Sequence, residues 1–341
     1  MRPADVTTFL AKAIPARQPI LLTGAPGVGK SDLVAQAAQQ AKADIILSHP
    51  VVSDPTDAKG LPWITEDRMS ATFLPFGELC DAINATRLTV WFLDDLGQAS
   101  PAVQASFMQL LLARRVNGHI LPDCITFVAA TNRRTDRAGV QGILEPVKSR
   151  FASIIPVDVD LEDWTNWAID NAIPAEVIAF LRFRPELLHQ FNPTADLTNS
   201  PCPRTWVNAA KLLALQLPMS IELSAIAGAI GEGPAGEFVS FLRMFRELPN
   251  LDAILLDPMS AQIPDSPSTL YAVCTGLATK ATATNFARIV QYCDRLYRAN
   301  HAEFAALLLR DCVRRDSKVC NTSAFQKLTA SPLGKLMLGE K

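Results

Sequence analysis

The sequence lacks close pairs of metal-binding residues and long apolar runs. Its seven cysteines never form a CxxC pair, and its four histidines are scattered singly. Zinc sites usually show closely spaced ligand pairs, so we expect ordinary thiols and no zinc. Nowhere do about eighteen apolar residues follow one another, and charges and prolines interrupt the start of the chain. These absences predict a cytoplasmic protein with no signal peptide and no contact with a membrane.

An excess of charge of one sign is also missing. The formal net charge is -2 and the isoelectric point is about 6.1, so the chain as a whole does not attract phosphate backbones. Basic, aromatic-rich stretches, which follow nucleic-acid backbones and stack on bases, are absent as well. Nucleic acid is therefore not the expected partner, and the cluster Arg133-Arg134-Thr135-Asp136-Arg137 is the main feature in its favour.

What the sequence does have is the composition of a folded protein. Its 341 residues are 49% apolar and 19% charged, and the chain is too long for one core of ordinary size. Up to residue 158, apolar runs typical of buried strands alternate with helical patterns. This alternation predicts a parallel sheet between two layers of helices. The later part shows only helical periodicity.

The expected elements follow this division. Strands are expected at 19–23, 44–48, 88–93, 124–130 and 153–157, and helices at 30–42, 76–85 and 101–115. Further helices are expected at 161–171, 174–183, 205–215, 270–280, 285–297 and 304–314. We predict an α/β fold with a three-layer αβα domain at 1–158, an all-helical domain at 159–248 and a helical C-terminal extension at 249–341.

A glycine-rich stretch fits the phosphate-binding pattern G-x-x-x-x-G-K-[ST], between an expected strand and an expected helix. Glycines let the backbone amides point at phosphate oxygens, and the helix N-terminus favours negative charge. Lys30 is expected on the β and γ phosphates of ATP, and the Ser31 hydroxyl on Mg²⁺. The fold is thus expected to be that of a P-loop NTPase. The predicted ATP-binding residues are Gly24, Ala25, Pro26, Gly27, Val28, Gly29, Lys30 and Ser31.

Two acidic residues, Asp94 and Asp95, end the apolar run 88–93. A neighbouring buried strand delivers such carboxylates to the phosphate-binding end of a parallel sheet. We expect Asp94 in the Mg²⁺ shell and Asp95 as the carboxylate that orients and deprotonates the attacking water. Asn132 ends the run 124–130 in the same way and is expected to present its amide to the γ-phosphate or to the water.

Together these motifs resemble the AAA+ ATPases, in which sensor 1 is a polar residue at the end of the strand beside the acidic pair. Asn132 matches it. Most relatives have Glu where this chain has Asp95. Within AAA+, the stretches DLGQASPAVQASFMQLLLARRVNG and GEFVSFLRMFRELPNLDAILLDP resemble the MoxR-like and dynein-related branch, and the likeness covers residues 1–255. The branch places an all-helical lid after the αβα domain.

The resemblance also implies two arginines in the site. The segment Leu144-Glu145-Pro146-Val147-Lys148-Ser149-Arg150-Phe151 matches the one that carries the arginine finger, which acts on ATP bound by the adjacent subunit. Arg150 is the candidate, with Lys148, Arg114 and Arg115 as alternatives. Arg204, in Pro201-Cys202-Pro203-Arg204-Thr205-Trp206, matches the sensor 2 arginine of the lid.

The resemblance further implies a homo-oligomeric ring, usually of six subunits, whose ATP cycle moves loops that face a central channel. Residues 54–63 fall where such a loop stands, and 63–74 is expected to be a β-hairpin insertion with Glu66-Asp67-Arg68 at its tip. The other reading of this stretch is a plain surface hairpin that shields the sheet edge. Lys59 and Trp63 are the residues expected to hold a polypeptide.

Three functions follow from these observations. The favoured one is a MoxR-like ATPase that remodels or chaperones a protein, alongside a partner with a von Willebrand A domain in many relatives. The second is a nucleic-acid motor or helicase loader. The third is a nucleotide-dependent switch with negligible hydrolysis, suggested because the Asp95 side chain is one methylene shorter than Glu.

Overall fold

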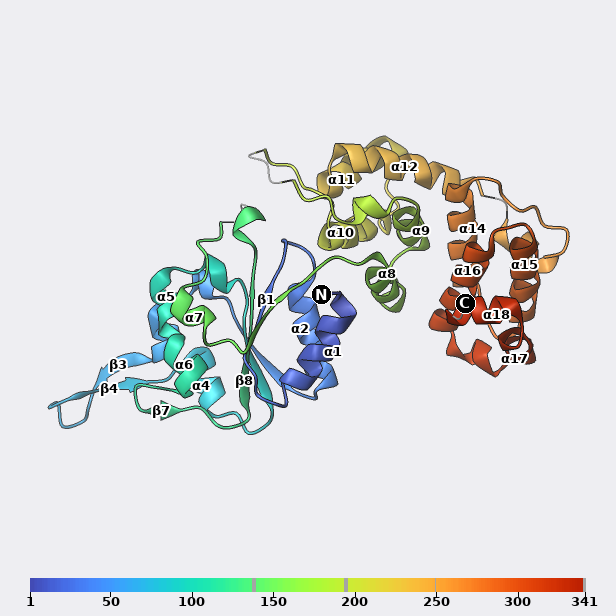
Figure 1. The fold of residues 1–341 in the computed structure, drawn as a ribbon. Coiled ribbons are helices and arrows are strands. Elements are labelled where there is room, and N and C mark those ends of the chain that lie inside the picture. Colours follow the sequence, from blue (N-terminus) through green and yellow to red (C-terminus); the bar gives the residue numbers. More distant parts are fainter. Residues whose placement is uncertain (137–138, 193–195, 249, 340–341) are drawn as a thin grey trace. The chain divides into compact units, whose positions relative to one another are not determined.

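A computed structural model describes residues 1–136, 139–192, 196–248 and 250–339. The chain divides into two compact units, Met1–Asp160 and Leu161–Lys341 (Figure 1). A further division of the second unit into a lid and an extension at residue 248 stays a prediction.

The first unit contains a five-stranded sheet in the order β2-β5-β8-β1-β9, and all its strand pairs are parallel. This confirms the predicted αβα class. The strands are β1 (Ile20–Thr23), β2 (Asp44–Ser48), β5 (Thr89–Leu93), β8 (Ile125–Thr131) and β9 (Ser153–Pro156). The expectation that 44–48 is a buried strand was wrong: Ile45 and Leu47 are 40% and 47% exposed because β2 forms an edge of the sheet.

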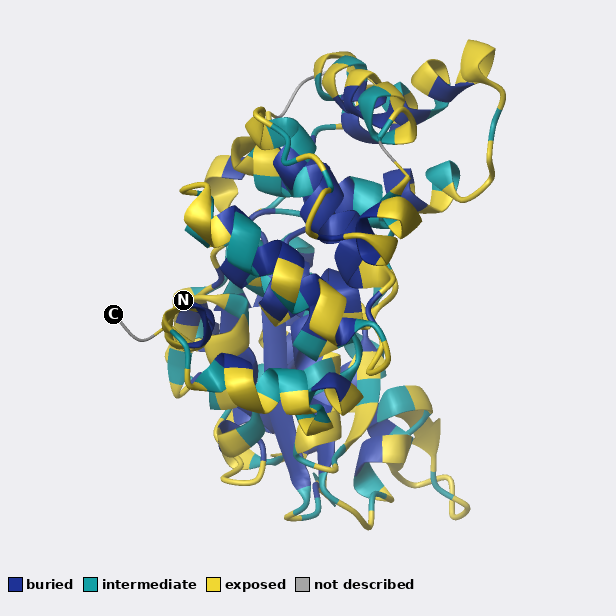
Figure 2. Ribbon diagram, turned by 90° about the vertical axis from the view of Figure 1, so that its right-hand side faces the viewer, coloured by how far each residue is buried: buried dark blue, intermediate teal, exposed yellow. Residues whose placement is uncertain are grey.

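Alternating side chains of the central strands supply two separate cores. Trp91 and Leu93 pack on one face and Val90 and Phe92 on the other, as expected when successive side chains point to opposite sides. Figure 2 shows these strands in dark blue beneath helices that are exposed on their outer side. Helices α1 (Pro3–Ala13) and α2 (Lys30–Gln40) cover one face, and α4 (Gly77–Ile83), α5 (Pro101–Ser106), α6 (Met108–Ala113) and α7 (Glu145–Lys148) cover the other.

The expected helix 101–115 was wrong in its extent. It is interrupted at Phe107 and ends at Ala113, and the chain then forms a hairpin of β6 (Arg115–Val116) and β7 (His119–Ile120). The turn Asn117-Gly118 has φ of 48° and 87°, which suits a two-residue hairpin turn. Asn-Gly is the sequence signal for such a hairpin, and the apolar pattern of the preceding helix obscured it.

A second hairpin confirms the insertion predicted at 63–74. Strands β3 (Leu61–Ile64) and β4 (Ala71–Leu74) pair antiparallel and follow the short helix α3 (Pro55–Lys59). The hairpin extends away from the body of the first unit in Figure 1. Asn117 Nδ2 donates to Lys59 O over 2.9 Å, and His119 Nε2 lies 2.7 Å from Phe73 O, so the two hairpins are joined.

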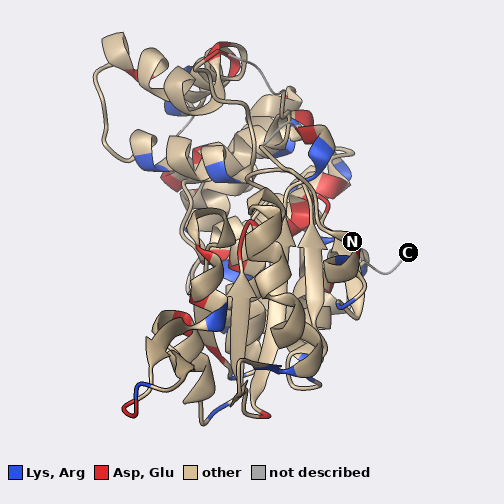
Figure 3. Cartoon of the chain, turned by 90° about the vertical axis from the view of Figure 1, so that its left-hand side faces the viewer, with Lys and Arg blue, Asp and Glu red and all other residues tan. Residues whose placement is uncertain are grey.

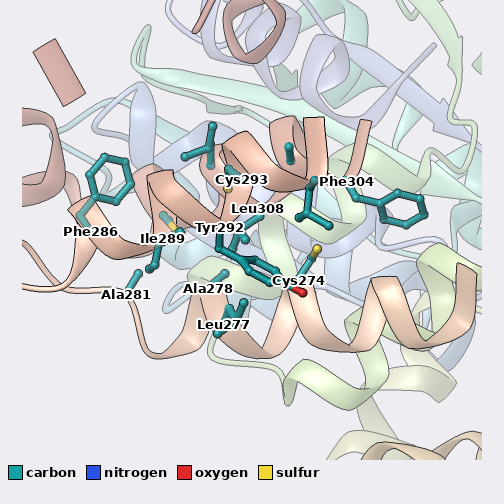
Figure 4. Close-up of a cluster of buried hydrophobic side chains, with 14 of the residues drawn as sticks. Cys274, Leu277, Ala278, Ala281, Phe286, Ile289, Tyr292, Cys293, Phe304 and Leu308 are labelled. Atoms are coloured by element: carbon teal, nitrogen blue, oxygen red, sulfur yellow. The ribbon is translucent and has the colours of Figure 1, made fainter. Parts of the chain in front are cut away.

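The second unit is helical throughout its described part, as predicted. Its helices are α8 (Leu161–Asp170), α9 (Ala175–Phe183), α10 (Pro203–Leu213), α11 (Met219–Ile230), α12 (Glu232–Arg246), α13 (Leu251–Leu256), α14 (Pro267–Thr279), α15 (Phe286–Arg298), α16 (Ala302–Arg315), α17 (Ser323–Thr329) and α18 (Pro332–Leu338). Figure 4 shows the core of its last part, in which Cys274, Tyr292 and Leu308 meet from α14, α15 and α16.

An ion pair ties α9 to α16 in this unit. Both terminal guanidinium nitrogens of Arg182 donate to the carboxylate of Asp311, over 2.6 and 2.8 Å, and the two side chains are only 11% and 5% exposed. None of the seven cysteines is in a disulfide. Within the described ranges, no helix has both the length and the apolar character needed to cross a bilayer.

Candidate functional site

The glycine-rich loop joins β1 to α2, as predicted. Gly27 and Gly29 have φ of 75° and 93°, which side chains disfavour, and Gly29 is the N-cap residue immediately before α2. A Cβ at Gly24 would lie 2.9 Å from Val157 O, so this position has no room for a side chain. The loop thus curls tightly in front of the α2 N-terminus, the arrangement that binds phosphate groups.

The Lys30 side chain lies inside this loop and is 7% exposed. Its ammonium nitrogen donates to Gly24 O and Ala25 O, each over 3.0 Å, and to Asn132 Oδ1 over 2.7 Å. Because the loop carbonyls fix the ammonium at the loop, its charge is placed where phosphate oxygens would be bound.

The Ser31 hydroxyl and the Asp94 carboxylate meet beside the lysine. Ser31 Oγ donates to Asp94 Oδ2 over 2.7 Å. Such oxygens are the ligands that Mg²⁺ prefers, and Mg²⁺ commonly takes one or two protein ligands together with phosphate oxygens and water. Within the described residues, no group of three or more His, Cys, Asp and Glu side chains is placed to hold a metal ion. The pair therefore fits Mg²⁺ that arrives with a nucleotide.

Asp95 and Asn132 complete the cluster. Asn132 is 8% exposed, and its Nδ2 donates to Asp95 Oδ1 over 3.3 Å while its Oδ1 accepts from Lys30. The side-chain amide of Asn132 thus connects the lysine to the second carboxylate. Asp95 has a left-handed backbone with φ of 56°, which costs about 1 kcal/mol for most residues and marks it as held by its surroundings.

The candidates for the finger have different surroundings in the first unit. Arg150 Nε donates to Met108 O over 2.9 Å, and a second nitrogen donates to Pro146 O. Lys148 pairs with Glu145 over 2.5 Å. Arg114 donates to Pro122 O and Ile125 O over 2.8 and 2.9 Å, so it secures the start of β8. Arg115 is exposed at the beginning of β6.

Arg204 lies in the second unit and is exposed in the first turn of α10. Its assignment as sensor 2 stays a prediction. Lys30, Ser31, Asp94, Asp95 and Asn132 are therefore the predicted residues that the structure brings together.

Sequence reasoning missed two residues behind the acidic pair, Gly97 and Gln104. A Cβ at Gly97 would lie 2.0 Å from Thr131 Oγ1, and Gln104 is 1% exposed. Glycine after a carboxylate pair was a usable signal for a close approach of backbones. Gln104 gave no such signal, because a polar residue in an amphipathic helix is normally expected on the solvent side.

Comparisons with known proteins agree with the site. Residues 19–151 match the AAA domain of the dynein-related subfamily. Midasin of Giardia intestinalis is 27% identical over 185 residues, which is 50% of this chain and 4% of that protein's length. The chain therefore corresponds to a small part of this relative.

Two solved structures also resemble the chain. The Holliday junction branch migration motor RuvB of Thermotoga maritima has a TM-score of 0.41 at 17% identity, over 80% of this chain and 81% of that one. NtrX of Brucella abortus in complex with ADP has a TM-score of 0.42 at 12% identity, over 97% and 68%. Scores of this size support no conclusion about function.

Fold and motifs together define a nucleotide-binding site of the P-loop class. Residues 19–151, a part of the first unit, match an AAA domain of the dynein-related subfamily.

Proposed function

We propose that this protein hydrolyses ATP with Mg²⁺ and couples the reaction to the remodelling of a protein client. The observation that carries the proposal is the Asn132 amide, which bonds to Lys30 over 2.7 Å and to Asp95 over 3.3 Å. A phosphate-binding lysine and a carboxylate joined by one amide are suited to hydrolysis, because the group that binds the γ-phosphate is linked to the group that activates water.

Each side chain then has a defined task. Lys30 binds the β and γ phosphates, and Ser31 and Asp94 hold Mg²⁺, which neutralises phosphate charge. Asp95 accepts the proton of the attacking water as the water oxygen bonds to the γ-phosphorus and the bond to the β,γ-bridging oxygen breaks. Asn132 keeps the Asp95 carboxylate in place and faces the γ-phosphate.

We propose Arg150 as the finger that stabilises the transition state of a neighbouring subunit in a hexameric ring. Arg204 is proposed to contact nucleotide from α10, and loss of turnover in Arg204→Ala with unchanged assembly would support that role.

We propose a protein client because the joined hairpins expose apolar surface. Trp63 and Ile64 are each 65% exposed and Met69 is 86% exposed on the β3–β4 hairpin. Apolar groups displayed in this way suit contact with a polypeptide. As in the MoxR-like branch, a partner with a von Willebrand A domain belongs to this proposal.

A nucleic-acid client has less support from the charges. Lys and Arg are interspersed with Asp and Glu in the view of Figure 3. In the basic cluster 133–137, Arg133 pairs with Asp136 over 3.1 Å, and Arg137 lies outside the described residues. The pairing with Asp136 leaves the Arg133 guanidinium less available to a phosphate backbone.

Phosphate release from Mg-ATP tests the hydrolysis. Asp95→Asn should lose turnover by at least about a hundredfold while calorimetry shows ATP affinity within about threefold of the wild type. Absence of turnover in the wild-type protein, with ATP still bound, would instead support the nucleotide switch.

The client is tested by stimulation of turnover. An unfolded polypeptide should raise the rate of the wild type and not that of Trp63→Ala or Lys59→Ala. Stimulation by DNA that weakens with salt, and that the two variants retain, would favour the nucleic-acid motor.

A further inference from the structure

The segment 139–144 connects the sensor strand β8 to α7 and Arg150. It has no helix or strand of its own, so its backbone groups need partners elsewhere. Two residues supply them. One is Gly97, which follows the acidic pair, and the other is Gln104 on α5.

Gly97 fastens the beginning of this segment to the acidic turn. Its carbonyl oxygen accepts from the backbone N–H of Gln141 over 3.0 Å and of Gly142 over 3.2 Å. Since a Cβ at Gly97 would lie 2.0 Å from Thr131 Oγ1, the turn is also pressed against the end of β8. The turn that carries Asp95 is thus hydrogen-bonded to the segment that leads to Arg150.

Gln104 fastens the end of the segment through both ends of its side-chain amide. Its Nε2 donates to Ala99 O over 3.1 Å and to Gly142 O over 2.8 Å, and its Oε1 accepts from Leu144 N over 3.0 Å. The side chain is 1% exposed, so water does not replace these partners. One buried amide therefore fixes the backbone on both sides of Ile143.

Backbone hydrogen bonds connect the position of Leu144 to that of Arg150. Leu144 precedes α7, and its carbonyl accepts from Val147 N and Lys148 N, each over 2.9 Å. Arg150 N then donates to Val147 O over 3.1 Å. Because Val147 is fully buried, this single turn has little freedom to shift unless Leu144 shifts with it.

We propose that Gln104 is a positioning residue that holds Arg150 in register with the Asp94–Asp95 turn of the same subunit. The inference rests on the proposed function, in which Arg150 acts on the ATP of a neighbour. Its consequence is unusual for a buried residue: a defect at Gln104 impairs the neighbouring site and leaves the site of its own subunit competent.

The variant Gln104→Met keeps the length of the side chain and removes its polar atoms. We expect turnover to fall at least about tenfold, with ATP affinity within about twofold of the wild type. The matched control is Ser106→Ala on the same helix, because Ser106 is 2% exposed and its hydroxyl donates to Val103 O of its own helix. This control should keep wild-type turnover.

Mixed assemblies distinguish positioning from general damage. Subunits with Gln104→Met are co-expressed with subunits carrying Asp95→Asn, whose own site is inactive and whose Arg150 is intact. With equal mixing, one interface in about four joins an intact Asp95 to an intact finger, so we expect about a quarter of the wild-type rate, more than either parent gives alone. Thermal unfolding confirms that both parents are folded, and Gln104→Glu replaces Gln104→Met if the latter does not assemble.

The reference mixture combines Arg150→Ala with Asp95→Asn. Recovery in both mixtures supports the proposal. Recovery in the reference mixture alone would overturn the role of Gln104 and leave the finger in place. Recovery in neither mixture would overturn the finger as well, and with it the premise on which the role of Gln104 depends.

Discussion

The hydroxyl of Ser31 donates to Asp94 over 2.7 Å although 63 positions separate the two residues. Ser31 follows β1 and Asp94 follows β5, and only β8 lies between these strands in the sheet. Parallel strands present their carboxyl ends at one edge, so both side chains reach the same place. The two oxygens are the part of the site suited to a divalent cation.

Removing either oxygen should therefore weaken the metal-dependent part of nucleotide binding. Calorimetric titration of ATP with and without Mg²⁺ should show that the cation improves affinity in the wild type at least about tenfold more than in Ser31→Ala or Asp94→Asn. Ser53→Ala is a control, since the Ser53 hydroxyl donates to the backbone oxygen of His49. Equal Mg²⁺ dependence in all four proteins would place the cation elsewhere.

The left-handed backbone of Asp95 gives a prediction about stability. Both Asp95→Gly and Asp95→Ala remove the carboxylate, but glycine adopts a φ of 56° without strain. We expect the glycine variant to be more stable than the alanine variant by about 1 kcal/mol in urea unfolding, the reverse of the order in a helix interior. An alanine variant of equal or greater stability would mean that the backbone relaxes at this position.

The ion pair of Arg182 and Asp311 should be important for the second unit. Arg182→Ala leaves a buried carboxylate without its partner, and we expect a loss of about 3 to 5 kcal/mol in the free energy of unfolding. The exposed pair Arg298 and Asp294, at 75% and 49% exposure, is the matched control, and Arg298→Ala should cost less than about 1 kcal/mol. Similar losses in the two variants would show that burial does not set the cost.

Buried thiols should make the second unit sensitive to alkali. Burial raises the pKa of Cys274 from 9.0 to about 12, and it also raises the pKa of Cys293 and of Cys312. Below pH 9 these thiols are neutral in both states. Above pH 9 these thiols ionise in the unfolded chain but stay neutral in the folded chain, so the free energy of unfolding falls as pH rises.

By pH 10 each of these thiols should remove about 1.4 kcal/mol from the free energy of unfolding. Urea unfolding at pH 8 and pH 10 measures the change. Cys274→Ala should reduce the difference between the free energies of unfolding at the two pH values by about 1.4 kcal/mol. A difference unaffected by the substitution would show that other groups cause the alkaline loss.

Local patterns of the sequence predicted the five strands of the sheet and the motifs that meet in the site. They did not predict several helices, among them α1, α11 and α12. Buried central strands such as β5 and β8 are continuous apolar runs, and Gly24 to Ser31 is a compact motif whose neighbours along the chain are its neighbours in space. The helix 101–115 was predicted too long, because its apolar pattern continues into residues that the Asn117-Gly118 turn draws into a hairpin.

The sequence by itself determined that Lys30, Ser31 and the acidic pair belong to a phosphate-binding protein, because each motif is formed by adjacent residues and by the strand or helix beside it. Only the tertiary structure decided that Asn132 connects Lys30 to Asp95 and that Gln104 hydrogen-bonds to the backbone on both sides of Ile143. The physical reason is that these partners are set by strand order and by the packing of α5, and hydrophobic periodicity does not specify which distant residue will face a buried amide.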